Sequence, residues 1–190
     1  MNLWRVPVSG GAGVRLPSAG LIYQWARPFP AGDQLLVLAN LPQQPLRLYV
    51  QSVGTGTVTP LTEPLMVRNA AASPDGRSVA LLKPDGKVLL YSADGGASRE
   101  LTQEPLAPIR WSKDGEWLFV MHLRSSVQSS CQVSRLSIGT GELLPWKTIQ
   151  PADITGVNSI TGVTIADDEK SYVYSYRRVL SDLYLVEGWR

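Results

Sequence analysis

The feature that most constrains this chain is a pair of turns that recur together at a fixed interval. The first turn is rich in glycine, and its third residue steps by 45, 40 and 45 along the chain, through Gly11, Gly56, Gly96 and Gly141. A second turn, of the Asp-Gly type, keeps the same period at residues 31–33, 73–77, 112–116 and, less faithfully, 167–170. Two independent turns that share one period indicate a repeat protein.

A period of about 40 to 45 residues is typical of HEAT or armadillo helix pairs and of β-propeller blades. Turn residues interrupt each repeat about every 8 to 12 positions, which leaves no amphipathic stretch long enough for a helix pair. Each Asp-Gly-type turn is followed by a nearly continuous apolar run, at residues 35–38, 79–82, 117–121 and 172–174. Such a run suits a strand that is buried on both faces, as the second strand of a propeller blade is. A β-sandwich of unrelated hairpins would leave the period unexplained.

The sequence therefore predicts an all-β fold, a partial or small β-propeller of about four blades, each with four antiparallel strands. We expect a single propeller region over residues 1–190, with blades at 21–62, 65–102 and 106–146, three strands of another blade at 154–188, and strands of an incomplete blade in 1–20. The first strand of the chain, at 3–8, and the last, at 183–186, both align with the third strand of a blade. This imbalance predicts the C-terminal part of a longer propeller, or a half that forms a homodimer to complete the ring.

Composition argues against several kinds of partner. The chain has 18 basic and 16 acidic residues, and its basic residues are mostly scattered, so it lacks the basic stripe that binding to nucleic acid requires. No run approaches the ~18 apolar residues of a spanning helix, so we expect no direct membrane insertion. Its one cysteine, Cys131, permits neither an internal disulfide nor a zinc site with several cysteine ligands.

No residue pattern points to catalysis. A Gly-x-Ser-x-Gly elbow is missing, and His122 is the only imidazole, which we interpret as a structural residue at a blade rim. Cys131 is expected to be a small buried residue. The carboxylates of 167–169 lack the alternating spacing of a calcium loop and predict a solvated turn, and Asp75 and Asp114 are expected to cap their own turns. We therefore expect no catalytic residue, no cofactor and no metal.

Three residues near the end of the chain are candidates for binding a partner. Arg177, Arg178 and Trp189 lie in the last expected hairpin or at the terminus. Arginine and tryptophan are the side chains that most often anchor protein interfaces. The sequence thus predicts a partner-binding surface there.

Several of these motifs resemble a known family. The turn at 73–77, the turn at 94–96 and the trailing Leu101-Thr102 resemble TolB-like (WD-repeat-like) β-propeller repeats over most of the chain. Residues 172–188 resemble the end of the C-terminal propeller in bacterial membrane-associated serine/threonine protein kinases. The resemblance implies a sensor or interaction platform in a periplasmic or extracytoplasmic setting. The kinase motifs themselves are missing from the sequence.

The sequence thus predicts a non-catalytic module that binds protein or peptide, as the C-terminal part of a signalling kinase. The alternative is a gating propeller segment of a prolyl-oligopeptidase-type peptidase, in which the hydrolase lies on another segment. Because propeller function resides in rim loops, the fold alone does not choose the ligand.

Overall fold

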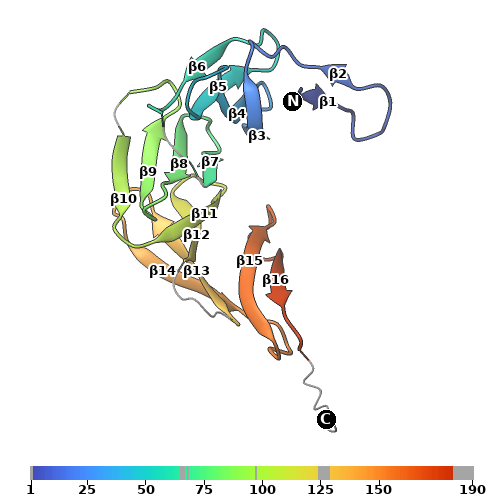
Figure 1. The fold of residues 1–190 in the computed structure, drawn as a ribbon. Helices are drawn as coiled ribbons and strands as arrows, with labels where there is room; N and C mark the ends of the chain where they lie inside the picture. Colours follow the sequence, from blue (N-terminus) through green and yellow to red (C-terminus); the bar gives the residue numbers. More distant parts are fainter. Residues whose placement is uncertain (1, 65–66, 68, 97, 124–128, 182–190) are drawn as a thin grey trace, which may run out of the picture.

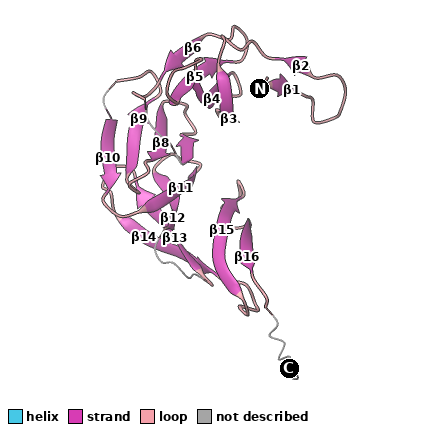
Figure 2. Cartoon of the chain, in the orientation of Figure 1, coloured by secondary structure: helices cyan, strands magenta, loops and turns pink. Residues whose placement is uncertain are grey.

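The sheets of the protein follow one another around an open arc (Figure 1). The computed structural model describes residues 2–181 except 65–66, 68, 97 and 124–128. Within these residues all regular structure is β-strand (Figure 2). None of the residues described there forms a helix long and apolar enough to cross a membrane.

Among the described residues, three sheets have four strands each and are complete blades. The first contains β3 (Ile22–Pro28), β4 (Gln34–Asn40), β5 (Arg47–Ser52) and β6 (Val58–Pro60). The second contains β7 (Asn69–Ala72), β8 (Ser78–Leu82), β9 (Val88–Ser92) and β10 (Ser98–Thr102). The third contains β11 (Leu106–Trp111), β12 (Trp117–His122), β13 (Cys131–Ser137) and β14 (Leu143–Ile149). Neighbouring strands are antiparallel and consecutive, so each blade is a four-stranded meander and the predicted fold class is confirmed.

Two shorter sheets lie at the ends of the arc. Strand β1 (Trp4–Arg5) pairs with β2 (Val14–Arg15), and β15 (Val157–Ile165) pairs with β16 (Tyr172–Arg178). The first strand of each complete blade lies on the concave side of the arc, and the fourth lies on the convex side (Figure 1). The concave side is therefore built from β3, β7, β11 and β15.

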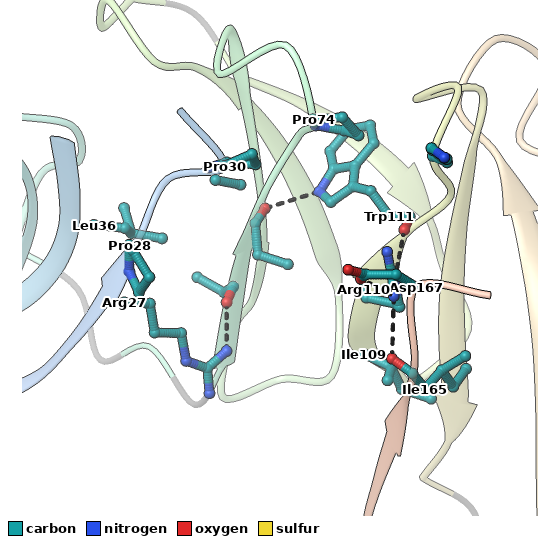
Figure 3. Close-up of a pocket in the computed structure, with 14 residues that line it drawn as sticks. Arg27, Pro28, Pro30, Leu36, Pro74, Ile109, Arg110, Trp111, Ile165 and Asp167 are labelled. Atoms are coloured by element: carbon teal, nitrogen blue, oxygen red, sulfur yellow. Dashed lines mark hydrogen bonds and ion pairs between the residues drawn. The ribbon is translucent and has the colours of Figure 1, made fainter. Parts of the chain in front are cut away.

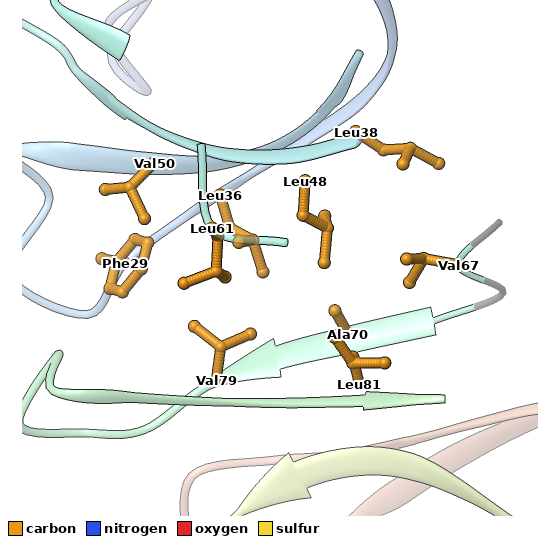
Figure 4. Close-up of a cluster of buried hydrophobic side chains, with 10 residues drawn as sticks. All are labelled: Phe29, Leu36, Leu38, Leu48, Val50, Leu61, Val67, Ala70, Val79 and Leu81. Atoms are coloured by element: carbon orange, nitrogen blue, oxygen red, sulfur yellow. The ribbon is translucent and has the colours of Figure 1, made fainter. Parts of the chain in front are cut away.

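The second strand of each complete blade is buried, and β8 and β12 lie between two neighbouring sheets. Alternate side chains of β4, including Leu36 and Leu38, pack against Val79 and Leu81 of β8 in one apolar cluster (Figure 4). The same alternation joins β8 to β12 and β12 to β16 in two further clusters. The near-continuous apolar runs of the sequence exist because both faces of these strands are buried.

The Asp-Gly-type turn has the same backbone geometry in every repeat. In the third blade the N–H of Gly115 donates to the carbonyl of Ser112, and Gly115 has a φ of +76°. Gly32 and Gly76 occupy the equivalent position at φ +77° and +71°, a region that L-residues with a side chain rarely adopt. In the last sheet Glu169 takes this position at φ +54° and its N–H donates to the carbonyl of Ala166, so this turn keeps the backbone geometry without the glycine.

A buried polar network attaches the first hairpin to the first complete blade. Gln51 is 0% exposed, and its Nε2 donates to the carbonyl of Pro17 at 2.6 Å. Its Oε1 accepts from the hydroxyl of Tyr23 at 2.9 Å, and that hydroxyl also lies 3.1 Å from the carbonyl of Ser18. Burial raises the pKa of Tyr23 above its ordinary value, so the phenol stays protonated as the donor. The linker at 17–18 is thus hydrogen-bonded to the core of the blade.

Substituting Gly115 tests the turn geometry. We expect Gly115→Ala to lower the free energy of unfolding by about 1–2 kcal/mol, because alanine at this φ is strained. A Cβ at this position would meet only Pro74 Cδ, at 3.8 Å, so the loss reports backbone strain and not a clash. Urea unfolding followed by tryptophan fluorescence measures it. Gly54→Ala is the control, because Gly54 has no positive φ and open space around its Cβ position; an equal loss there would contradict the prediction.

Removing the amide of Gln51 tests the buried network. We expect Gln51→Leu to destabilise the protein by about 1–3 kcal/mol, because the carbonyl of Pro17 and the hydroxyl of Tyr23 each lose a buried partner. Thermal unfolding measures the change. Gln24→Leu, at an exposed position of β3, is the matched control and should leave the melting temperature within the error of the wild type.

Candidate functional site

Side chains on the concave side of the arc link each blade to the next. Arg27 Nη1 of β3 donates to the carbonyl of Ala70 in β7 at 2.7 Å. Asn69 Nδ2 of β7 donates to the carbonyl of Pro108 in β11 at 2.6 Å. Arg110 Nη1 of β11 donates to the carbonyl of Ile165 in β15 at 3.1 Å. The first strands are therefore tied in sequence, from β3 to β15, by bonds to backbone carbonyls.

A pocket opens beside these links, and we call it the inner-rim pocket. Its volume is about 600 Å³. Most of its lining is apolar and includes Pro28, Pro30 and Pro74. Trp111 stands in the wall, with its Nε1 donating to the carbonyl of Ala71 at 2.9 Å. The indole is thus held by a neighbouring blade and presents its ring at a fixed angle.

Cationic groups stand around this apolar lining. Arg27 lies on one side of the inner-rim pocket and Arg110 on the other, as Figure 3 shows. Arg110 is also paired with Asp167, at 2.9 Å between Nη1 and Oδ1. Lys113 lines the pocket from an exposed position. The pocket therefore combines an apolar wall with three cations and one carboxylate, which suits an elongated ligand that carries negative charge.

Sequence reasoning missed the residues of this pocket. Trp111 is buried, and it also lines the pocket. Arg27 and Arg110 were not singled out. Both stand two residues before the residue that opens the Asp-Gly-type turn, and aligning the repeats at that turn would have shown the coincidence.

The histidine and the cysteine have structural surroundings. His122 Nε2 is 2.9 Å from the hydroxyl of Ser134, across the β12–β13 pair. Cys131 is buried in the apolar cluster between the third blade and the last hairpin. Burial raises the pKa of the Cys131 thiol, which opposes the thiolate that a nucleophile needs. This arrangement confirms Cys131 as a small buried residue.

The carboxylates of the last Asp-Gly-type turn are engaged locally. Asp168 Oδ1 accepts from the backbone N–H groups of Lys170 and Ser171, at 2.9 and 2.8 Å. Glu169 Oε1 accepts from the backbone N–H of Lys113 at 2.9 Å. Within the described residues no group of three or more His, Cys, Asp or Glu side chains is arranged to hold a metal ion.

The capping role expected for two earlier aspartates is confirmed. Asp75 Oδ1 accepts from the N–H of Arg77 at 3.0 Å, and Asp114 Oδ1 accepts from the N–H of Glu116 at 3.0 Å. The hydroxyl of the serine that opens each turn also donates to the same oxygen, and this bond is the largest cause of the lowered pKa of both carboxyls.

The structure describes two of the three predicted partner-binding residues, Arg177 and Arg178. Arg178 Nη2 lies 3.1 Å from Asp153 Oδ2 and donates to the Asp153 carbonyl at 2.6 Å, so it fastens the loop that leads into β15. Arg177 is exposed and, as the residue before Arg178 in β16, projects from the other face of the sheet. Trp189 lies outside the described residues. A partner surface made of these residues stays a prediction.

Known proteins resemble this chain in sequence family and in fold. The family model described as the lipoprotein LpqB β-propeller domain matches residues 48–169. TolB from Acinetobacter baumannii superposes with a TM-score of 0.69 at 16% identity, over 95% of this chain and 44% of TolB. A putative TolB from Agrobacterium tumefaciens superposes with a TM-score of 0.64 at 18% identity, over 91% of this chain and 67% of that protein. An oligogalacturonate lyase from Vibrio parahaemolyticus superposes with a TM-score of 0.57 at 15% identity, over 84% of this chain and 49% of the lyase.

These identities establish the fold and nothing finer. No curated protein matches the sequence. The chain spans less than half the length of the Acinetobacter TolB, so the activity and partners of a whole protein do not transfer to it directly.

Lowering the pH tests the carboxylate caps. The N–H and hydroxyl of Ser171 lower the pKa of Asp168 from 3.8 to about 2. Because the folded pKa is the lower one, the stabilising contribution is present above the unfolded value and is lost as the pH falls from about 4 toward 2. We expect the free energy of unfolding of Asp168→Asn to fall less steeply than that of the wild type over this window. Urea titrations at stepwise lower pH measure the slopes, and equal slopes would contradict the assignment.

Proposed function

We propose that this chain, which belongs to the lipoprotein LpqB β-propeller domain family, is a non-catalytic recognition module. In this proposal the inner-rim pocket binds an extended protein segment. The observation that carries the proposal is the make-up of that pocket. It places Arg27, Arg110 and Lys113 around a wall of prolines and an indole. Such a site suits a peptide with apolar residues beside aspartate or glutamate.

The geometry of the pocket supports an extended segment over a small compact ligand. Most of the lining comes from β3, β7, β11, β15 and the turns that follow them, so the pocket runs across the first strands of successive blades. An extended peptide spans such a distance with few residues, because each residue adds ~3.3 Å. Its carboxylates would meet guanidinium or ammonium groups, which form the stronger, charge-assisted hydrogen bonds.

The setting of this module is a further part of the proposal. We place it beside a signalling kinase outside the cytoplasm, as the resemblance of residues 172–188 implies, although much of that stretch lies outside the described residues. Sequencing the upstream reading frame tests this setting: a kinase motif set supports it. A nucleophile elbow in a following domain would favour the peptidase alternative, for which no described residue supplies a specific argument.

Peptide binding tests the pocket directly. The probe is an array of short synthetic peptides in two matched sets, one with Asp or Glu and the other with Asn or Gln at the same positions. We expect the acidic set to bind preferentially. Fluorescence anisotropy of the best binder should then show that Lys113→Glu weakens the affinity by about tenfold or more, because it reverses a charge in the lining.

A charge reversal outside the pocket is the matched control. Lys170→Glu changes the net charge by the same amount at an exposed position that does not line the inner-rim pocket. Its affinity should stay near that of the wild type. Equal losses in the two variants would reveal attraction to overall charge, and equal binding of the two peptide sets would overturn the proposed specificity.

A further inference from the structure

The inner-rim pocket is lined by equivalent positions of the four repeats. The second residue of the Asp-Gly-type turn lines it each time, and these residues are Pro30, Pro74, Lys113 and Asp167. The first two are uncharged, the third is a cation and the fourth is an anion. Among the described lining residues, Asp167 is the one that carries a carboxylate. The repeat therefore places a negative charge inside a pocket whose other charges are positive.

Asp167 is paired with an arginine that the backbone already holds. Arg110 Nε donates to the carbonyl of Trp111 at 3.0 Å, and Nη1 donates to that of Ile165 at 3.1 Å. Nη1 also donates to Asp167 Oδ1 at 2.9 Å, and Figure 3 shows the two side chains together. The side chain of Arg110 is 24% exposed, whereas that of Asp167 is 100% exposed. The carboxylate is thus the less firmly held member of the pair.

The first repeat shows that an arginine at this position is held without a carboxylate. Arg27 stands at the repeat position of Arg110, and its Nη1 donates to two neutral oxygens of β7, both at 2.7 Å. Pro74 stands where Asp167 stands in the last repeat, and a proline supplies no countercharge. Asp167 is therefore not required to fix the guanidinium, which leaves its charge free for another role.

The shape of the guanidinium makes Asp167 a competitor of a bound carboxylate. A carboxylate binds arginine most strongly through two parallel N–H donors. Nε of Arg110 is bound to a backbone carbonyl, and both hydrogens of Nη1 are engaged, one by Ile165 and one by Asp167. A ligand carboxylate that binds across Nη1 and Nη2 must displace one of them. Asp167 is the one that leaves, because it is an exposed side chain and the carbonyl of Ile165 is fixed in β15.

We propose that Asp167 sets the charge selectivity of the inner-rim pocket, by occupying Arg110 until an acidic side chain of the ligand replaces it. This inference rests on the peptide site proposed above and names the residue that regulates it. The exchange leaves the number of ion pairs at Arg110 unchanged. An acidic segment therefore gains less at Arg110 than at Arg27, where no carboxylate has to leave.

Removing the charge of Asp167 tests this role. We expect Asp167→Asn to tighten the binding of the acidic peptide set by about two- to fivefold, the range that an exposed ion pair spans. The matched set with Asn or Gln has no carboxylate to exchange, so it should bind the wild type and the variant alike. Fluorescence anisotropy titrations of both sets measure the difference.

A carboxylate outside the pocket provides the matched control. Glu63 is 96% exposed, lies 3.8 Å from Arg47 in a surface ion pair and does not line the inner-rim pocket. Glu63→Gln changes the net charge by the same amount as Asp167→Asn and should leave the affinity for acidic peptides near that of the wild type. An equal gain in the two variants would show attraction to overall charge and would overturn the role of Asp167.

Thermal unfolding separates selectivity from a structural role. Asp167→Asn should melt near the wild type, because Arg110 keeps its two bonds to backbone carbonyls. A large loss of stability would assign Asp167 to the blade boundary and overturn the inference. Acidic peptides that respond to Lys113→Glu but not to Asp167→Asn would overturn this inference alone. Absence of binding in every variant would overturn it together with the proposed function.

Discussion

Side chains of β8 and β12 point alternately at the sheet before and the sheet after, and the architecture depends on this two-sided burial. The side chains of Leu36 and Leu38 in the first blade point toward the second blade, and those of Val79 and Leu81 in the second blade point toward the first. The three complete blades therefore complete one another's cores. Repeat proteins gain stability in this way, because one unit alone cannot bury its apolar faces.

The last sheet shows what happens where this packing ends. The side chains of Tyr172 and Tyr174 in β16 point toward the third blade and pack in its apolar cluster. The alternate residues of β16 point to the opposite face of the sheet; they are Val173, Ser175 and Arg177. Val173 is 69% exposed there. The run at 172–174 was expected to be buried on both faces, and it is buried on one because the described residues place no further sheet beyond it.

The inner-rim pocket is a consequence of the same arrangement. Packing the second strands brings the first strands close on the concave side, where Arg27 and Arg110 reach the backbone of the next blade. These bonds hold the guanidinium groups and the indole of Trp111 in place before any ligand arrives. A preorganised site loses less conformational entropy on binding than a mobile one.

The repeat turns determined most of the fold in advance. A glycine at the positive φ of Gly32, Gly76 and Gly115, an aspartate that caps the turn and an apolar run after it are local requirements, so the sequence alone indicated strands, blades and fold class. The pocket could not be foreseen in this way, because Arg27, Asn69 and Arg110 act on carbonyls about 40 to 55 residues away. Residues so far apart in the sequence come into contact only when the sheets are arranged side by side around the arc. Local chemistry thus decides which elements form, and tertiary packing decides which side chains meet between them.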